Sequence, residues 1–171
     1  MRLTAFNVKQ QGQVKVLLVG LLLAAALGAG VMTWQAMQKD FETLDGSRYR
    51  WSEFSGKWVV VNYFAEWCAP CLREIPELVA FHDEKPEDTT IFAVSYDPLS
   101  KDRIRELKNQ YQIHLPLVVP DENMIMPMER PPYLPATFII GPDGTVKKTL
   151  MGEVSETLLT DTITALKSQT L

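Results

Sequence analysis

The feature that most constrains the fold is an apolar, strand-like run that leads into two closely spaced cysteines. Residues 58–64 read WVVVNYF, a continuous β-branched and aromatic run of strand length, which predicts a strand covered on both faces. Cys68-Ala69-Pro70-Cys71 follows, with Pro70 at a favourable first-turn position of a helix expected over about 69–84. A buried strand that runs into a helix in this way places Cys68 at the helix N-terminus.

The rest of the chain predicts an α/β domain with a mixed sheet flanked by helices. A small hairpin is expected over 41–51, about the turn signal Asp45-Gly46. The later elements, in chain order, are a strand at 91–95, a helix at 101–111, a strand at 117–119, a hairpin over 136–150 and a closing helix at 155–167 with Ser155 as N-cap. Alternating strands and helices predict parallel strands with right-handed crossovers. Pro76 should kink the first helix.

An uncharged apolar segment precedes this domain. Residues 16–34 form nineteen positions without a charge, and as a helix they would span roughly 28 Å, close to one bilayer core. Basic residues stand only before it, so the positive-inside rule predicts a cytoplasmic segment 1–15, a membrane anchor 16–34, a linker 35–40 and an extracytoplasmic domain 41–171. The alternative is a signal peptide cleaved near Ala24-Ala25-Ala26.

Charge excludes one class of partner. From Lys39 onward, 14 Lys and Arg stand against 21 Asp and Glu, a net charge of −7. A surface this acidic repels phosphate backbones, so nucleic acid is not expected as a partner.

The two cysteines predict a working redox pair. The loop between Cys68 and Cys71 is too short for a stabilising crosslink, and a helix N-terminus favours a thiolate on Cys68. We expect Cys68 to be the accessible, attacking nucleophile and Cys71 to resolve the mixed disulfide. Half a zinc site is the rival hypothesis, but there is no second cysteine pair, and His82 and His114 are isolated.

A family resemblance rests on the residues around this pair. Residues 60–76, VVNYFAEWCAPCLREIP, resemble thioredoxin, and more closely the extracytoplasmic TlpA/ResA/DsbE-like branch of that superfamily. Further similarity lies in Leu134-Pro135-Ala136-Thr137-Phe138, in Gly144 and Gly152, and in Gly56-Lys57. The likeness covers about residues 41–166 and implies a thioredoxin-like fold.

The resemblance also implies a substrate-binding loop. It predicts a cis peptide bond before Pro135, which would place the loop beside the sulfurs, with Leu134 influencing redox behaviour; an ordinary trans turn is the alternative. Trp67 is expected to pack against the disulfide. Together with Ala69, Pro70 and Leu134 it should form the substrate-binding surface.

Proton handling is the second implication. Asn62 stands where thioredoxin has a buried aspartate that serves the inner cysteine, and asparagine does not titrate. Glu74, three residues after Cys71 on the same helix, matches the branch's active-site glutamate. The alternative interpretation is that Glu74 is a solvent-exposed carboxylate on the helix surface. Glu66 is a second candidate, although a surface role fits it better.

The sequence therefore predicts a thiol–disulfide oxidoreductase that acts on protein disulfides outside the cytoplasm. The resemblance favours a reductant, recharged by a membrane electron-transfer protein and held in the inner membrane with its domain in the periplasm. No metal and no cofactor beyond the cysteine pair is expected. Preparation of apocytochrome c thiols is one such role, although residues 130–134, RPPYL, lack the Gly-Val-Tyr-Gly-Ala pattern of dedicated members.

Three alternatives to the reductant stay open. The first is a disulfide-forming oxidase, since a Cys-x-x-Cys sequence does not fix a potential. The second is a copper-handling module that uses Cys68, Cys71 and the thioethers of Met124, Met126 and Met128. Soft sulfur ligands suit Cu(I), although such methionines more often pack against a substrate groove or a core. A peroxidase is less well supported, because the sequence lacks the Pro-x₃-Thr-x₂-Cys arrangement of peroxiredoxins.

Overall fold

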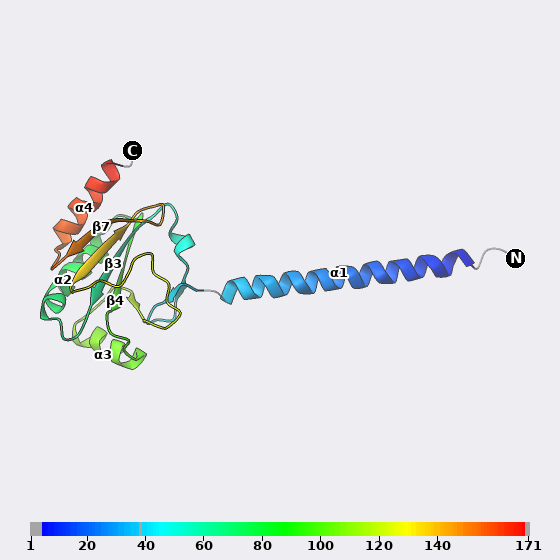
Figure 1. Cartoon of the computed structure of the whole chain (residues 1–171), viewed down its shortest axis with the longest axis horizontal. Helices are drawn as coiled ribbons and strands as arrows, with labels where there is room; N and C mark the ends of the chain where they lie inside the picture. Colours follow the sequence, from blue (N-terminus) through cyan, green and yellow to red (C-terminus); the bar gives the residue numbers. More distant parts are fainter. Residues whose placement is uncertain (1–4, 38, 170–171) are drawn as a thin grey trace. The chain divides into compact units, whose positions relative to one another are not determined.

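The computed structural model describes residues 5–37 and 39–169, which divide into two compact units at the boundary between residues 38 and 39. The first unit contains a single helix, α1 (Ala5–Met37), and the second contains every other element (Figure 1). The domain boundary predicted from the sequence at residue 41 therefore falls two residues inside the second unit.

Helix α1 contains the predicted membrane segment. Among the described residues it alone is long and apolar enough to cross a membrane, over Lys15–Thr33 with a mean hydropathy of 2.4. These properties are shared by anchors and signal sequences. The helix continues to Met37, so residues 35–37 of the predicted linker are helical, because Gln35, Ala36 and Met37 are good helix formers with no Gly or Pro among them. Residues 1–4 and 38 of the predicted segments lie outside the described residues.

A five-stranded mixed sheet forms the centre of the second unit. Its strand order is β5-β4-β3-β6-β7, with the apolar run predicted from the sequence as the middle strand. The strands are β3 (Trp58–Phe64), β4 (Thr89–Ser95), β5 (Leu117–Val118), β6 (Ala136–Ile140) and β7 (Val146–Met151). The β3, β4 and β5 strands are parallel, whereas β6 and β7 are antiparallel, so the predicted α/β architecture is confirmed.

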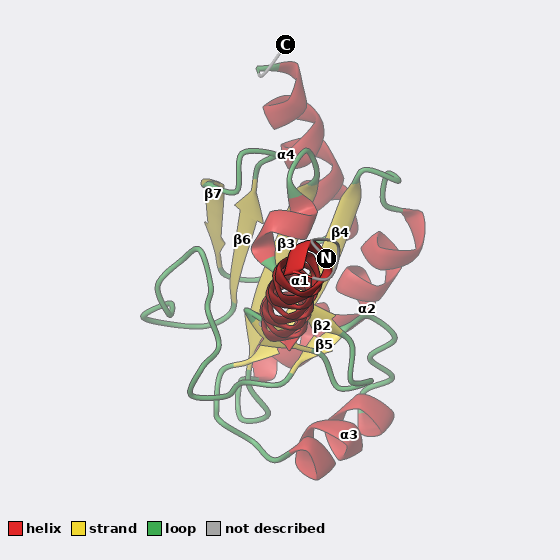
Figure 2. Cartoon of the chain, turned by 90° about the vertical axis from the view of Figure 1, so that its right-hand side faces the viewer, coloured by secondary structure: helices red, strands yellow, loops and turns green. Residues whose placement is uncertain are grey.

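Three helices accompany the sheet, close to their predicted bounds (Figure 2). They are α2 (Ala69–Glu84), α3 (Lys101–Gln110) and α4 (Glu156–Ser168). The Ser155 side chain caps α4, as predicted, by accepting from the backbone N–H of Leu158. Helix α2 runs through Pro76 as one element, and the kink expected there stays a prediction.

The sheet separates two apolar clusters because alternate β3 side chains point to opposite faces. Trp58, Val60 and Phe64 join a cluster with buried residues of all three helices, including both cysteines. Val59, Val61 and Tyr63 join the other cluster, which packs against aromatic side chains that follow the first strand. Every residue of β3 is therefore buried, as the sequence predicts for a strand covered on both faces.

The two edges of the sheet are protected in different ways. The predicted N-terminal hairpin, β1 (Phe41–Glu42) and β2 (Arg48–Tyr49), lies against β5, where Leu44 donates its N–H to Leu117 O and Val119 donates to Glu42 O. A 3₁₀ turn, η1 (Trp51–Phe54), follows this hairpin. At the opposite edge, β7 exposes Lys147 and Lys148, charges that discourage further strand pairing.

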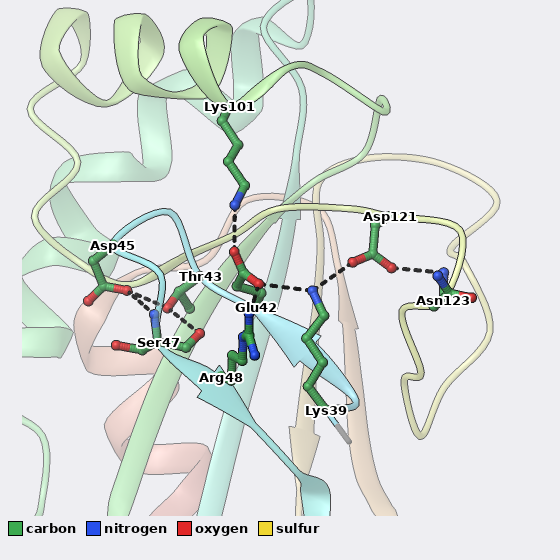
Figure 3. A network of polar contacts seen from close by, with 9 residues as sticks. All are labelled: Lys39, Glu42, Thr43, Asp45, Ser47, Arg48, Lys101, Asp121 and Asn123. Carbon is green, nitrogen blue, oxygen red and sulfur yellow. Dashed lines mark hydrogen bonds and ion pairs between the residues drawn. The ribbon is translucent and has the colours of Figure 1, made fainter. Parts of the chain in front are cut away.

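A polar network fastens the hairpin to its surroundings (Figure 3). The Glu42 carboxylate pairs with Lys39, Arg48 and Lys101, the first residue of α3, and Lys39 also pairs with Asp121. Hydrogen bonds from Lys101 and Lys39 lower the pKa of Glu42 to about 2. The start of the domain is thus fixed to both α3 and the 120–128 loop.

Candidate active site

The two cysteines form a disulfide at the start of α2. Cys68 is the N-cap of the helix, and its Cα lies 5.3 Å from that of Cys71. The Cys68 Sγ accepts a hydrogen bond from the Cys71 backbone N–H at 3.3 Å. This is one of the donors that a helix N-terminus leaves unpaired. Pro70 lies within the first turn, where its missing N–H costs nothing.

The accessibility expected for Cys68 is not found in this disulfide form. Cys68 is 5% exposed and Cys71 is fully buried, and both belong to the core cluster on the helix side of the sheet. In this form the Cys68 sulfur is bonded to that of Cys71, a fully buried residue. The expectation of an exposed sulfur applies only to the form with free thiols.

The Leu134-Pro135 peptide bond is cis, as predicted. Strand β6 begins at the next residue, Ala136, which pairs with Tyr63 near the end of β3. Because β3 ends four residues before Cys68, the loop and the disulfide lie at the same end of the sheet. Pro135 is buried, with its carbonyl accepting from the Gly152 N–H at 2.9 Å, and Leu134 packs against both apolar clusters.

Glu74 is buried on the inner side of the pair, one helical turn beyond Cys71. It is 2% exposed, which excludes the alternative of a solvated carboxylate. Its Oε1 accepts from Asn62 Nδ2 at 2.8 Å, and its Oε2 accepts from the Val154 N–H at 2.9 Å. Burial raises the pKa of Glu74 to about 7, against the opposing effect of these two hydrogen bonds. A carboxyl with this pKa can take up or release a proton near neutral pH.

Asn62 connects this carboxyl to the strand that follows the cis proline. It is fully buried, and its Nδ2 also donates to Thr137 Oγ1 at 3.0 Å, so both amide hydrogens are used. The Asn62 Oδ1 has no hydrogen-bond partner among the described residues. Asn62 therefore positions the side chain that can titrate, consistent with its own inability to do so.

The other predicted site residues lie on the outer side of the pair. Trp67 is 64% exposed, and its indole N–H donates to Asp97 Oδ2 at 2.7 Å while its ring meets Tyr96 edge-on at 6.3 Å. Its indole is thus directed toward the loop after β4, and the packing on the disulfide expected from the sequence stays a prediction. Ala69 is exposed and Pro70 is half-buried, and their contact with a substrate stays a prediction.

Glu66 has a surface role, as the sequence analysis favoured. Its Oε2 accepts from both Nε and Nη2 of Arg103, at 3.0 and 2.6 Å, which joins the segment before Cys68 to α3. A carboxylate committed to a guanidinium in this way is poorly suited to exchange protons with the cysteines.

The three methionines pack against the core. Met124, Met126 and Met128 are half-buried and contact the apolar cluster that contains Phe41 and Phe92. This is the structural role that the sequence analysis set against copper binding. Within the described part of the chain, no three His, Cys, Asp or Glu residues form a group that could hold a metal ion.

Sequence reasoning missed the partners that fix Glu74 and Trp67. Val154 donates through its backbone, which no side-chain pattern can reveal. Asp97 and Tyr96 lie in the loop after β4, a segment in which no motif indicates a site. Thr137 lies in the quoted Leu134–Phe138 motif, and its position two residues after Pro135 was the one available signal.

Comparison with known proteins places these features in context. Residues 33–149 match the model of the AhpC/TSA family. The thiol-disulfide oxidoreductase ResA of Bacillus subtilis is 28% identical over 127 residues, covering 74% of this chain and 70% of the relative. ResA of Geobacillus thermodenitrificans is 28% identical over 163 residues, covering 86% and 92%. Among solved structures, StoA from Bacillus subtilis superposes with a TM-score of 0.62 at 18% identity, covering 71% and 92%.

Proposed function

The chain belongs to the AhpC/TSA family and is a thiol–disulfide oxidoreductase of thioredoxin-like fold, and from this premise we propose that it reduces protein disulfides outside the cytoplasm. The observation that carries the proposal is the Cys68–Cys71 disulfide at the N-terminus of α2, backed by a buried carboxyl one turn away. The family and the relatives support the reaction class, while the direction and the location are proposed.

The reaction runs in two exchange steps. In the reduced form, the Cys68 thiolate attacks one sulfur of the partner disulfide, and the other partner sulfur leaves with the electron pair as a thiolate. The Cys71 thiolate then attacks the Cys68 sulfur of the mixed disulfide and expels the second partner thiolate. Two electrons pass to the partner, and the Cys68–Cys71 bond is formed. Hydrogen bonding at the helix N-terminus supports charge on Cys68.

Glu74 supplies the proton acceptor for Cys71 in this proposal. Cys71 is fully buried in the disulfide form, which favours a nearby protein group over bulk water as the acceptor of its proton. Glu74 lies three residues further along the same helix, which makes the two side chains neighbours, and its pKa of about 7 suits exchange with a thiol. Asn62 and Val154 hold the carboxyl in place.

A reducing direction fits the charge around the pair. An ionised Glu74 next to Cys71 disfavours a second negative charge there, and a pair whose thiolates are less stabilised is a weaker oxidant. The test is the equilibrium potential of Cys68–Cys71 against glutathione. We expect a value nearer to thioredoxin, about −270 mV, than to a strong oxidant at about −120 mV. A value at the oxidising end would overturn the reductant proposal in favour of disulfide formation.

The proposed location is the periplasmic face of the inner membrane, with α1 as a retained anchor. Support comes from the apolar window Lys15–Thr33 and from basic residues that stand only on its N-terminal side. The recharging partner is then a membrane electron-transfer protein. We expect the protein to resist alkaline carbonate extraction and to keep its N-terminus. Release into the soluble fraction with a new N-terminus after Ala26 would identify a cleaved signal peptide instead.

A further inference from the structure

An unpaired arginine stands on the outer side of the disulfide. Six arginines lie in the described part of the chain, and five of them form ion pairs with carboxylates: Arg48, Arg50, Arg73, Arg103 and Arg105. The sixth, Arg130, is exposed and has no carboxylate within ion-pair distance among those same residues. The domain has an excess of acidic residues, so an arginine without a carboxylate partner is unexpected and indicates a role outside the ion-pair network.

Arg130 is held in place by an aromatic ring and a backbone carbonyl, and not by an ion pair. Its guanidinium carbon lies 3.6 Å from the centroid of the Tyr96 ring, and its Nη2 donates to the Tyr96 carbonyl at 2.8 Å. The ring and the carbonyl fix one face and one edge of the guanidinium. The donors on its other edges stay available for a planar, bidentate contact with a carboxylate. The arginine is thus pre-organised rather than freely mobile.

Tyr96, the residue that holds Arg130, also contacts the segment that precedes Cys68. Tyr96 donates its N–H to Phe64 O, at the end of β3, at 2.7 Å. The Tyr96 ring meets Trp67 edge-on, and Trp67 immediately precedes Cys68. Along the chain, Arg130 opens the short segment that ends at the cis Leu134-Pro135 bond. The cation therefore rests on a residue that contacts both the end of β3 and Trp67, the neighbour of Cys68 in the chain.

We propose that Arg130 is a specificity-determining residue that selects partner segments with a carboxylate close to the disulfide-bonded cysteine. The occupant is an extended stretch of the protein substrate, whose cysteine faces Cys68 and whose Asp or Glu, two residues away on the same face, reaches Arg130. The contact is local, because the net charge of the domain would repel an acidic partner at longer range. This inference rests on the proposed function.

Three synthetic peptides test the proposal. Each carries a central cysteine as its mixed disulfide with 2-thiopyridine, and they differ only in having Asp, Asn or Lys two residues before and after that cysteine. Attack by reduced Cys68 on the peptide sulfur expels thiopyridone, which is followed by absorbance. We expect the second-order rate constant of thiopyridone release to fall in the order Asp, Asn, Lys, with roughly a fivefold range at low salt. Raising the salt concentration should compress that range.

Variants assign the preference to Arg130. Arg130→Gln should make the rates of thiopyridone release from the three peptides equal. Arg130→Glu should invert the order of these rates. Arg105→Gln makes the same charge change on α3, away from the disulfide, and should leave the wild-type order intact. Tyr96→Phe keeps the ring and the carbonyl and should retain the preference, whereas Tyr96→Leu should weaken it. A wild-type order that persists in Arg130→Glu would overturn the proposal. Absence of thiopyridone release from all three peptides would instead overturn the proposed function.

Discussion

The two sides of the disulfide use polar groups in opposite ways. On the inner side, Glu74 and Asn62 are buried and connected by short hydrogen bonds that include one backbone donor. On the outer side, Trp67 and Arg130 are exposed and held by contacts that leave part of each available. Burial shifts a pKa on the inner side, and exposure presents a contact surface on the outer side. Proton handling and partner recognition are thus assigned to different groups of residues.

The largest effect is expected from the cysteines, which join the two sides. Cys68→Ser should reduce disulfide reduction to background, because the nucleophile is lost. Cys71→Ser should leave attack possible and trap the partner as a mixed disulfide, because the resolving thiol is lost. Non-reducing electrophoresis followed by mass spectrometry would detect the adduct. Equal trapping by both variants would contradict the separate roles.

The inner side predicts a pH-dependent stability. The folded-state pKa of Glu74 is raised to about 7 from 4.5, so its contribution is fully present below pH 4.5 and is lost as pH rises through 7. We expect unfolding free energy of the oxidised protein to fall by on the order of 3 kcal/mol across this window. Glu74→Gln should remove that fall with pH, even if the variant differs from the wild type in its unfolding free energy at any one pH.

Chemical denaturation at several pH values measures this dependence. Glu84→Gln is the matched control, since Glu84 is an exposed carboxylate at the C-terminal end of the same helix. It should retain the wild-type fall. An unchanged pH profile in Glu74→Gln would show that another group titrates in this range.

A smaller effect is expected where the inner network meets β6. Thr137→Val removes the acceptor for one Asn62 N–H and leaves that donor buried without a partner. The cost should be about 1–3 kcal/mol of unfolding free energy. Thr162→Val, on the exposed surface of α4, makes the same chemical change and should cost less than about 0.5 kcal/mol. Equal costs for the two variants would mean that Asn62 finds a new partner.

The smallest effect is expected for an ion pair on the outer side. Glu66→Gln weakens the contact with Arg103, which is partly exposed, so the loss should be about 0.2–1 kcal/mol and should shrink at high salt. Thiol pH profiles should not move. A shifted cysteine titration in this variant would return Glu66 to the list of proton-handling candidates and blur the division between the two sides.

The local elements could be predicted from the sequence because each has a local cause. The apolar run of β3 and Pro70 in the first turn of α2 fix a strand and a helix whose bounds match the expected ones. Position 74 could be selected from its spacing to Cys71. What could not be predicted are contacts made across the fold: the Val154 N–H on Glu74, the Arg103 pair of Glu66 and the burial of Cys68 in the disulfide form. These depend on how elements pack, which no spacing encodes.

The protected edges of the sheet limit how a protein substrate can bind. The N-terminal hairpin covers the outer side of β5, and the exposed lysines of β7 disfavour the pairing of an incoming strand at the other border. A protein substrate is then expected to contact the loops at the strand ends, where only a few of its residues can bind at once. A contact of so few residues would favour release of the substrate after each exchange.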